Sequence, residues 1–248
     1  MKPAIVAIVD ILGTKGVWSD EKWRNKYFDC IDAVEKSFIN GKINFDKAIK
    51  GDSILELKFI PFSDTLVIAI INNGVDQNRN EYFFYEIISS FSQFMLGIFQ
   101  IYSGHDFFIK GAISFGDVEI RDKYFIGPAI DDVAEYFESQ EMFGICLTPK
   151  ASLAMNYAID WNRKHFNKEV DKFLIKYNTP LKNNIKTELY QVNWANWYYE
   201  YEKESEISAL SLFSQQLDKR NISSNVLPKI NNSIEFLKFV KSQQSNKP

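Results

Sequence analysis

The stretch AIVAIVDIL, residues 4–12, is an almost unbroken apolar run rich in valine and isoleucine. This composition is typical of a β-strand that is buried on both faces of a sheet. We therefore expect residues 4–12 to form the central strand of the fold. Asp10 interrupts the run, and a buried carboxylate without a partner costs several kcal/mol there, so the folded chain has to compensate its charge.

The residues that follow predict alternating helices and strands. After the loop 13–20, in which Asp20 is a candidate N-cap, apolar residues recur at helical spacing at Trp23, Tyr27, Ile31, Val34 and Phe38. Two β-rich runs, 53–62 and 65–71, have only Ser63 and Asp64 between them and predict a hairpin. A second amphipathic helix is expected over 81–102, and a strand over 107–115. This order predicts an α+β protein with a ferredoxin-like βαββαβ core, in which both helices cover one face of an antiparallel sheet.

The second half of the chain predicts additions to this core. We expect a helix over 127–140, a short strand over 144–147, and a late hairpin of 172–177 and 188–194 with a polar connection between its strands. From Glu202 onward the pattern is helical, with one apolar face at Ile207, Leu210, Phe213 and Leu217 and another at Ile234, Leu237 and Val240. Residues 241–248 are expected to be a frayed polar tail. We divide the chain into a main domain, 1–200, and a C-terminal helical extension, 201–248.

Composition excludes several classes of protein. The chain has 248 residues, 46% apolar and 25% charged, as ordinary globular proteins do. Its net charge of −3 argues against a general nucleic-acid binder, which needs a basic surface. The apolar region 82–102 contains too many polar residues for a membrane span, and residues 4–9 do not form a signal peptide. The two cysteines, Cys30 and Cys146, are expected to be reduced, and the protein to be cytoplasmic without a membrane partner.

Asp10 and Asp64 are candidate metal ligands. Asp64 lies at the tip of the expected hairpin, which pairs beside the first strand in a ferredoxin-like topology. Two carboxylates brought together there repel each other, and a bound Mg²⁺ or Mn²⁺ is the usual remedy. The alternative for either aspartate alone is a turn cap.

Gly13-Thr14-Lys15-Gly16 follows the first strand and precedes a helix. Backbone N–H groups and the helix dipole suit such a loop to phosphate oxygens, although a plain connection has the same form. The spacing of a P-loop is absent. The two histidines, His105 and His165, stand in no zinc or serine-hydrolase motif.

Four short stretches then stand out together: VDILG at 9–13, FSDTLV at 62–67, KGAISFGDV at 110–118 and FIGPAI at 125–130. In this order they resemble the landmarks of class III nucleotidyl cyclases, over roughly residues 4–195. The spelling KGAIS-x-G followed by GPA is most similar to the Pycsar pyrimidine cyclases of bacterial antiphage defence.

The resemblance implies a role for each of these stretches. Asp10 and Asp64 would bind two Mn²⁺ or Mg²⁺ ions, with the backbone carbonyl of Ile11 as a further ligand. The loop Gly13-Thr14-Lys15-Gly16 would bind the triphosphate, and residues 1–200 would be the cyclase catalytic domain. In such a site the ribose 3′-hydroxyl attacks the α-phosphorus and pyrophosphate leaves.

The departures from the purine-cyclase pattern concern the base and the ribose. Ile60 and Tyr124 stand where adenylate cyclases carry a base-reading lysine and aspartate, and an apolar and an aromatic residue there fit a pyrimidine ring better. Asp131 and Glu135 stand where purine cyclases carry a ribose-orienting asparagine and a charge-stabilising arginine. A carboxylate cannot replace that arginine. Lys110 is the preferred substitute, and the other nearby candidates are Lys15, Arg121 and Lys123.

The expected activity is conversion of UTP to 3′,5′-cyclic UMP, with CTP giving cyclic CMP as the neighbouring alternative. The resemblance also implies a head-to-tail homodimer and a separate effector protein that senses the cyclic nucleotide. A purine cyclase with an unusual base pocket stays open as a rival hypothesis. So does a non-catalytic nucleotide-sensing or dimerisation module, which Asp131 and Glu135 would favour.

Overall fold

The computed structural model describes residues 1–12, 14, 17–48, 55–74, 80–121, 124–166, 173–201 and 226–245. The strands are β1 Lys2–Leu12, β2 Leu55–Phe62, β3 Thr65–Asn72, β4 Phe108–Arg121, β5 Tyr124–Ile126, β6 Gly144–Leu147, β7 Leu174–Leu181 and β8 Ile185–Val192. The α-helices are α1 Glu21–Ala48, α2 Asn80–Gly104, α3 Pro128–Ser139, α4 Pro149–Phe166, α5 Trp194–Tyr201 and α7 Leu227–Ser245. Two short 3-10 turns are η1 Val17–Ser19 and η3 Lys182–Asn184.

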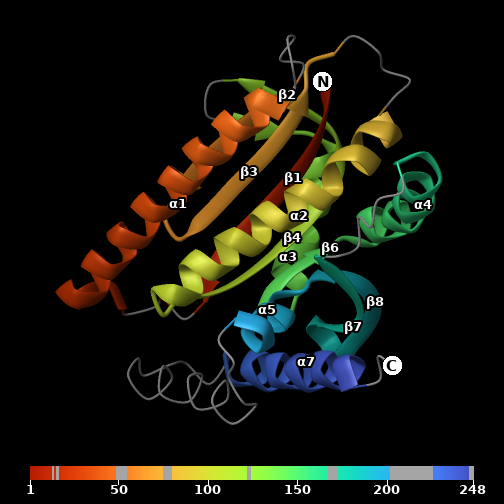
Figure 1. The fold of residues 1–248 in the computed structure, drawn as a ribbon. Coiled ribbons are helices and arrows are strands. Elements are labelled where there is room, and N and C mark those ends of the chain that lie inside the picture. The colour runs from red at the N-terminus through yellow and green to blue at the C-terminus, as the bar shows by residue number, and fades with distance from the viewer. Residues whose placement is uncertain are drawn as a thin grey trace.

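The predicted ferredoxin-like core is confirmed. The sheet order is β2-β3-β1-β4-β6-β8-β7, with β5 paired to β4 alone. β1 lies between β3 and β4 and runs antiparallel to both, so residues 4–12 form a central strand as expected. The late hairpin extends the same sheet through β6, which pairs in parallel with β4 (Figure 1).

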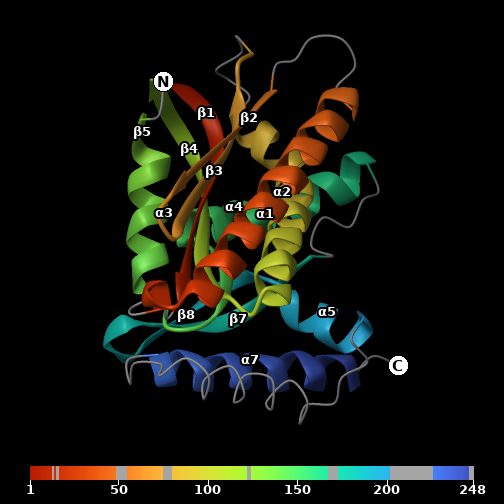
Figure 2. The same cartoon turned by 90° about the vertical axis from the view of Figure 1, so that its left-hand side faces the viewer.

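The alternation of side chains along β1 separates two apolar clusters. Ile5, Val9 and Ile11 face the larger cluster, which includes residues of α1, α2 and α4. Val6 and Ile8 face the smaller cluster, where Ala129 and Val133 of α3 cover the opposite side of the sheet. Figure 2 shows α3 on one side of the sheet and α1 with α2 on the other. α1 begins as predicted, since the Asp20 carboxylate accepts a hydrogen bond from the Lys22 amide at 2.8 Å.

The late hairpin is present as predicted, but the second half differs from the sequence-based expectations in three details. The helix α4 was not predicted, because its buried face is built mostly from small residues (Ala151, Ala154 and Ala158) while Leu153 and Tyr157 are exposed, which hides the apolar stripe. The late hairpin has longer strands and a shorter connection, Lys182–Asn184, than expected. Residues 241–245 belong to α7 rather than to a frayed tail.

α7 lies along the end of the molecule that β7 and β8 form (Figures 1 and 2). Leu237 and Val240, from the second predicted helical face, are buried in the larger cluster. The first predicted face, 207–217, lies outside the described residues, and the boundary at residue 201 stays a prediction. Of the helices that the structure describes, none is long and apolar enough to cross a bilayer.

Gly127 is the glycine whose replacement is expected to destabilise the fold most clearly. Its φ is 132°, and a Cβ atom there would lie 2.5 Å from the Asp117 carbonyl oxygen. Gly127→Ala should therefore lower the free energy of unfolding by about 3 kcal/mol in urea denaturation. Gly97→Ala is the matched control, because Gly97 lies inside α2 and a Cβ atom there would meet nothing within 4 Å. If the Gly127→Ala protein were as stable as the Gly97→Ala protein, this account of the connection between β5 and α3 would be contradicted.

Candidate functional site

The structure brings Asp10 and Asp64 together at one end of the central strand. Asp10 is close to the end of β1, and its Cα partner on β3 is Thr65. Asp64 occupies the tight turn between β2 and β3, directly before Thr65. The Ile11 backbone N–H donates a hydrogen bond to the Asp64 carbonyl oxygen at 3.1 Å. The hairpin turn is thus fastened to β1 at the residue that follows Asp10.

Two threonine hydroxyls orient the two carboxylates reciprocally. Thr65, next to Asp64, donates a hydrogen bond from its hydroxyl to Asp10 Oδ1 at 2.9 Å. Thr14, on the chain that follows Asp10, donates to Asp64 Oδ2 at 2.6 Å. Each carboxylate therefore has its direction set by the segment that carries the other one. Thr65 was not among the predicted site residues, although its place directly after Asp64 in a tight hairpin was a usable signal.

The charge on Asp10 is destabilised in this position. Burial raises the pKa of its carboxyl group above the usual value, and the nearby Asp64 carboxylate raises it further. The hydrogen bond from Thr65 and the positive charge of Lys110 act in the opposite direction. A cation placed between the two aspartates would remove both the repulsion and the cost of burial.

Lys110 faces Asp10 from the neighbouring strand. The two residues are Cα partners in the β1–β4 register, and Lys110 is only 9% exposed. Its ammonium nitrogen lies 4.8 Å from the centre of the Phe137 ring of α3. Within the described part of the chain, this ammonium group has no hydrogen-bond or ion-pair partner. Burial lowers the pKa of Lys110, an effect that Asp10 opposes and that Lys229 and Lys182 strengthen.

An aromatic group supports the turn that carries Asp64. The Tyr27 hydroxyl of α1 donates a hydrogen bond to the carbonyl oxygen of Ser63, a residue whose φ is 56°. The Tyr27 ring meets Trp18 and Phe107 edge-on, with ring centres 4.9 and 6.3 Å apart. Sequence periodicity indicated only that Tyr27 belongs to the helix face that packs on the core, because its contact with the turn depends on the tertiary structure.

The donor set suits a hard divalent cation that is shared with a substrate. The described residues contain no cluster of three or more His, Cys, Asp or Glu side chains that could hold a metal. Asp10, Asp64 and the backbone at Ile11 offer two carboxylates and main-chain oxygen. Mg²⁺ is commonly bound in this way, by one or two carboxylates that leave its other positions to water and phosphate oxygens.

The two predicted base-reading residues lie on different strands of one chain. Ile60 is half-buried on β2, where it pairs with Val67. Tyr124 is 64% exposed on β5 and pairs with Arg121, at the opposite end of β4 from Lys110. At about 3.3 Å per residue, Lys110 and Arg121 lie on the order of 35 Å apart along this strand. Within one chain Arg121, a candidate for the missing arginine, is therefore far from Asp10.

The remaining predicted residues lie on α3 or outside the described chain. Asp131 and Glu135 are exposed on the first two turns of α3. Phe137, two residues further on, is the α3 side chain that contacts Lys110. Gly13, Lys15, Gly16 and Lys123 lie outside the described residues. Thr14 is described, and its hydroxyl binds Asp64.

Thr65→Val is expected to weaken metal binding without unfolding the protein. The variant loses the hydrogen bond that lowers the pKa of Asp10, so deprotonation of Asp10 needs a higher pH. The loss of one such bond, about 1 kcal/mol, corresponds to roughly a fivefold weaker affinity for Mn²⁺ at neutral pH, measurable by electron paramagnetic resonance. Thr187→Val on β8 serves as the control. Equal Mn²⁺ affinity in the two variants would argue against an orienting role for Thr65.

Solved structures of other proteins resemble this chain in part of its fold, at a sequence identity of 10–11%. No family model and no curated protein matches the chain. A bacterial light-regulated adenylyl cyclase is 10% identical, with a TM-score of 0.43, and the match covers 87% of this chain and 98% of that one. An adenylate/guanylate cyclase/hydrolase from Silicibacter pomeroyi is 11% identical, with a TM-score of 0.38, and the match covers 77% and 95%.

A second structure of a bacterial light-regulated adenylyl cyclase is 10% identical, with a TM-score of 0.45, and the match covers 88% of this chain and 57% of that one. The elements themselves define an α+β protein with a ferredoxin-like core, which holds a pair of carboxylates and a lysine at one end of its central strand.

Proposed function

We propose that the protein is a nucleotidyl cyclase that converts UTP to 3′,5′-cyclic UMP and pyrophosphate with two Mn²⁺ or Mg²⁺ ions. One observation carries the proposal. Asp10 and Asp64 are held together at the end of β1, and the Lys110 ammonium faces Asp10 without a hydrogen-bond or ion-pair partner among the described residues. The resemblance of residues 9–13, 62–67, 110–118 and 125–130 to class III cyclases supports the same reading.

Each residue would have its own part in the reaction. Asp10, Asp64 and the Ile11 carbonyl would hold the two cations, which, when bound, lower the pKa of the ribose 3′-hydroxyl and neutralise the triphosphate. The ribose 3′-oxygen forms a bond to the α-phosphorus, and the bond from the α-phosphorus to the oxygen shared with the β-phosphate breaks. Pyrophosphate leaves, and the hydroxyl proton passes to water. Lys110 stabilises the negative charge that develops on the phosphate oxygens. Thr14 and Thr65 keep the two carboxylates oriented.

Two positions support a pyrimidine substrate. Ile60 is half-buried on β2, and the Tyr124 side chain is exposed on β5. By resemblance these positions read the base, and neither side chain offers the lysine or aspartate of an adenine site. CTP remains the alternative substrate, because an apolar and an aromatic side chain do not distinguish the two pyrimidines.

A homodimer would explain where the base-reading residues lie. Tyr124 is at the far end of β4 from Asp10 in the same chain, so a base in contact with Tyr124 cannot belong to a triphosphate at Asp10 unless a second copy contributes one of them. The neighbouring Ile126 is 56% exposed, so β5 presents apolar surface that a partner would cover. We therefore propose that each site lies between two protomers. From the resemblance alone, we further propose that the protein acts in the cytoplasm and that a separate effector protein senses its product in antiphage defence.

A non-catalytic nucleotide-sensing module is the second candidate. Asp131 and Glu135 both present exposed carboxylates on α3, where purine cyclases carry asparagine and arginine. A purine cyclase is a third reading of the same fold.

The test is to incubate the purified protein with ATP, GTP, CTP or UTP in Mn²⁺ and to identify products by mass spectrometry. Cyclic UMP that disappears in Asp64→Ala would support the proposal, and cyclic CMP would change only the base. A cyclic purine would overturn the roles of Ile60 and Tyr124. Nucleotide binding without any product would favour the sensing module. Sedimentation of the same sample tests the dimer.

A further inference from the structure

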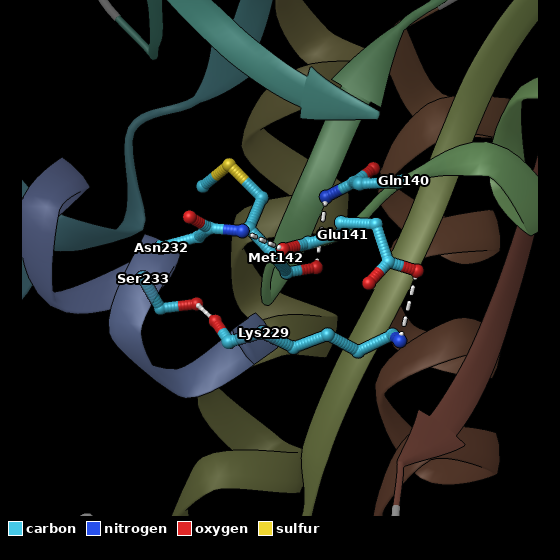
Figure 3. A network of polar contacts seen from close by, with 6 residues as sticks. All are labelled: Gln140, Glu141, Met142, Lys229, Asn232 and Ser233. Atoms are coloured by element: carbon cyan, nitrogen blue, oxygen red, sulfur yellow. Dashed lines mark hydrogen bonds and ion pairs between the residues drawn. The ribbon is translucent and has the colours of Figure 1, made fainter. Parts of the chain in front are cut away.

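The C-terminal helix α7 is fastened to the segment 140–144 by three side chains on one of its faces. Lys229 Nζ lies 3.0 Å from Glu141 Oε1, and Asn232 donates a hydrogen bond to the Glu141 carbonyl oxygen at 2.7 Å. The Ser233 hydroxyl accepts a hydrogen bond from the Phe143 amide at 2.8 Å. Figure 3 shows the Lys229 side chain extending from α7 to the Glu141 carboxylate.

The ion pair between Lys229 and Glu141 is shielded from solvent. Its side chains are 14% and 21% exposed, whereas those of the Lys238–Glu235 pair on the same helix are 48% and 63% exposed. An exposed pair contributes little, but a charge that loses its partner in a shielded place remains desolvated and seeks another. Lys229 therefore balances the negative charge of the Glu141 carboxylate in a place where water does so only in part.

The segment 140–144 lies beside Lys110, because it enters β6, the strand that pairs with β4 at this residue. Gly144 is the Cα partner of Lys110 in the parallel pairing of β4 and β6. The Phe143 ring stacks on Phe108, two residues before Lys110, with ring centres 4.5 Å apart. Beside the larger effect of burial, Lys229 lowers the pKa of Lys110 and Glu141 raises it, so both charges lie within electrostatic reach of the Lys110 ammonium.

We infer that Lys229 is a positioning residue of the candidate site: it neutralises Glu141 and thereby keeps the Lys110 ammonium available to the anionic substrate beside Asp10. The inference rests on the proposed function in naming the triphosphate of a nucleotide as that anion. Without Lys229, the Glu141 carboxylate attracts Lys110 and withdraws it from the phosphate. The helix α7, distant in sequence from both aspartates, is then part of the working site.

The first experiment is a rescue by a second substitution. Lys229→Met should weaken the binding of UTP with Mn²⁺ about tenfold in titration calorimetry, because the freed Glu141 carboxylate competes with the triphosphate for the Lys110 ammonium. Lys229→Met/Glu141→Gln should recover most of the affinity, because it removes the freed carboxylate. Lys229→Arg and the control Lys238→Met should bind as the unaltered protein does. Thermal unfolding monitors the fold of each variant.

The double variant separates positioning from simple docking of the helix. If the ion pair only holds α7 in place, the double variant binds UTP as weakly as Lys229→Met or more weakly, and the inference is overturned. Unchanged affinity in Lys229→Met overturns it too.

A second readout does not depend on nucleotide binding. Acetic anhydride labels free lysine amines, and peptide mass spectrometry measures the rate at Lys110 relative to Lys150. An ammonium held by Glu141 reacts more slowly, so Lys229→Met should slow labelling of Lys110 severalfold and the double variant should restore it. Equal rates in all three proteins contradict the inference. If the unaltered protein binds no nucleotide, the proposed function fails, while this labelling result still decides the role of Lys229.

Discussion

Asp64→Asn is expected to lower the rate of cyclic nucleotide formation by about a thousandfold or more. Asp10→Asn should have the same effect, because each substitution removes a carboxylate that binds the divalent cations. The measurement is product formation with UTP and Mn²⁺, together with Mn²⁺ binding by electron paramagnetic resonance. Asp160→Asn, at an exposed position of α4, is the matched control and should retain full activity. Near-normal turnover in either site variant would show that the reaction does not depend on these aspartates.

The same substitution at Asp10 is expected to stabilise the metal-free protein at neutral pH. Burial and Asp64 raise the pKa of Asp10, so the folded state binds this proton more tightly than the unfolded state does. The contribution of Asp10 to stability is therefore fully present below the pKa of an unfolded aspartate, about 3.9, and is lost as the pH rises through the higher folded-state value. At pH 7 the ionised Asp10 carboxylate therefore lowers the free energy of unfolding, and the Asp10→Asn substitution removes this negative charge.

Thermal unfolding in a chelator checks this result. The melting temperature of Asp10→Asn should exceed that of the unaltered protein at pH 7, and the difference should vanish as the pH falls toward 4. Addition of Mn²⁺ should raise the melting temperature of the unaltered protein alone. A variant that melts lower at pH 7 without metal would mean that Asp10 is satisfied by its own neighbours and needs no cation.

Lys110→Met should lower the turnover number about a hundredfold or more, the loss that follows removal of one group aimed at transition-state charge. Methionine keeps the length of the side chain and its contact with Phe137, so the fold should persist. Mn²⁺ affinity should not fall, because Lys110 opposes rather than assists a cation beside Asp10. The readouts are steady-state kinetics with UTP and Mn²⁺ titration.

Lys150→Met is the matched control for Lys110. Lys150 also lies over an aromatic ring, 4.7 Å from the centre of Phe115, but it comes from α4 and donates a hydrogen bond to the Phe115 carbonyl oxygen. We expect this variant to keep its activity. Equal losses in the two variants would mean that the effect of Lys110→Met comes from general packing and not from charge at the phosphate.

Local patterns were sufficient for most of the core. The apolar run at 4–12, the two-residue break at Ser63 and Asp64, and the helical spacing over 81–102 each contain their own periodicity, so β1, the β2–β3 hairpin and α2 lie where they were predicted. α4 was missed because alanines carry its buried face. The polar sequence 241–245 hid the last turns of α7, which packing upstream supports.

The sequence by itself determined the ferredoxin-like order of elements and singled out Asp10 and Asp64, because a charged residue among apolar neighbours is visible without a structure. Only the tertiary structure decided how they are used. The bond of Thr65 to Asp10, the place of Lys110 opposite Asp10, and the pairing of Lys229 with Glu141 join residues that are 55 or more positions apart. The first two contacts depend on strand register, because a shift of one residue would turn Asp10, Thr65 or Lys110 to the other face of the sheet. The third depends on how α7 docks against the segment that precedes β6.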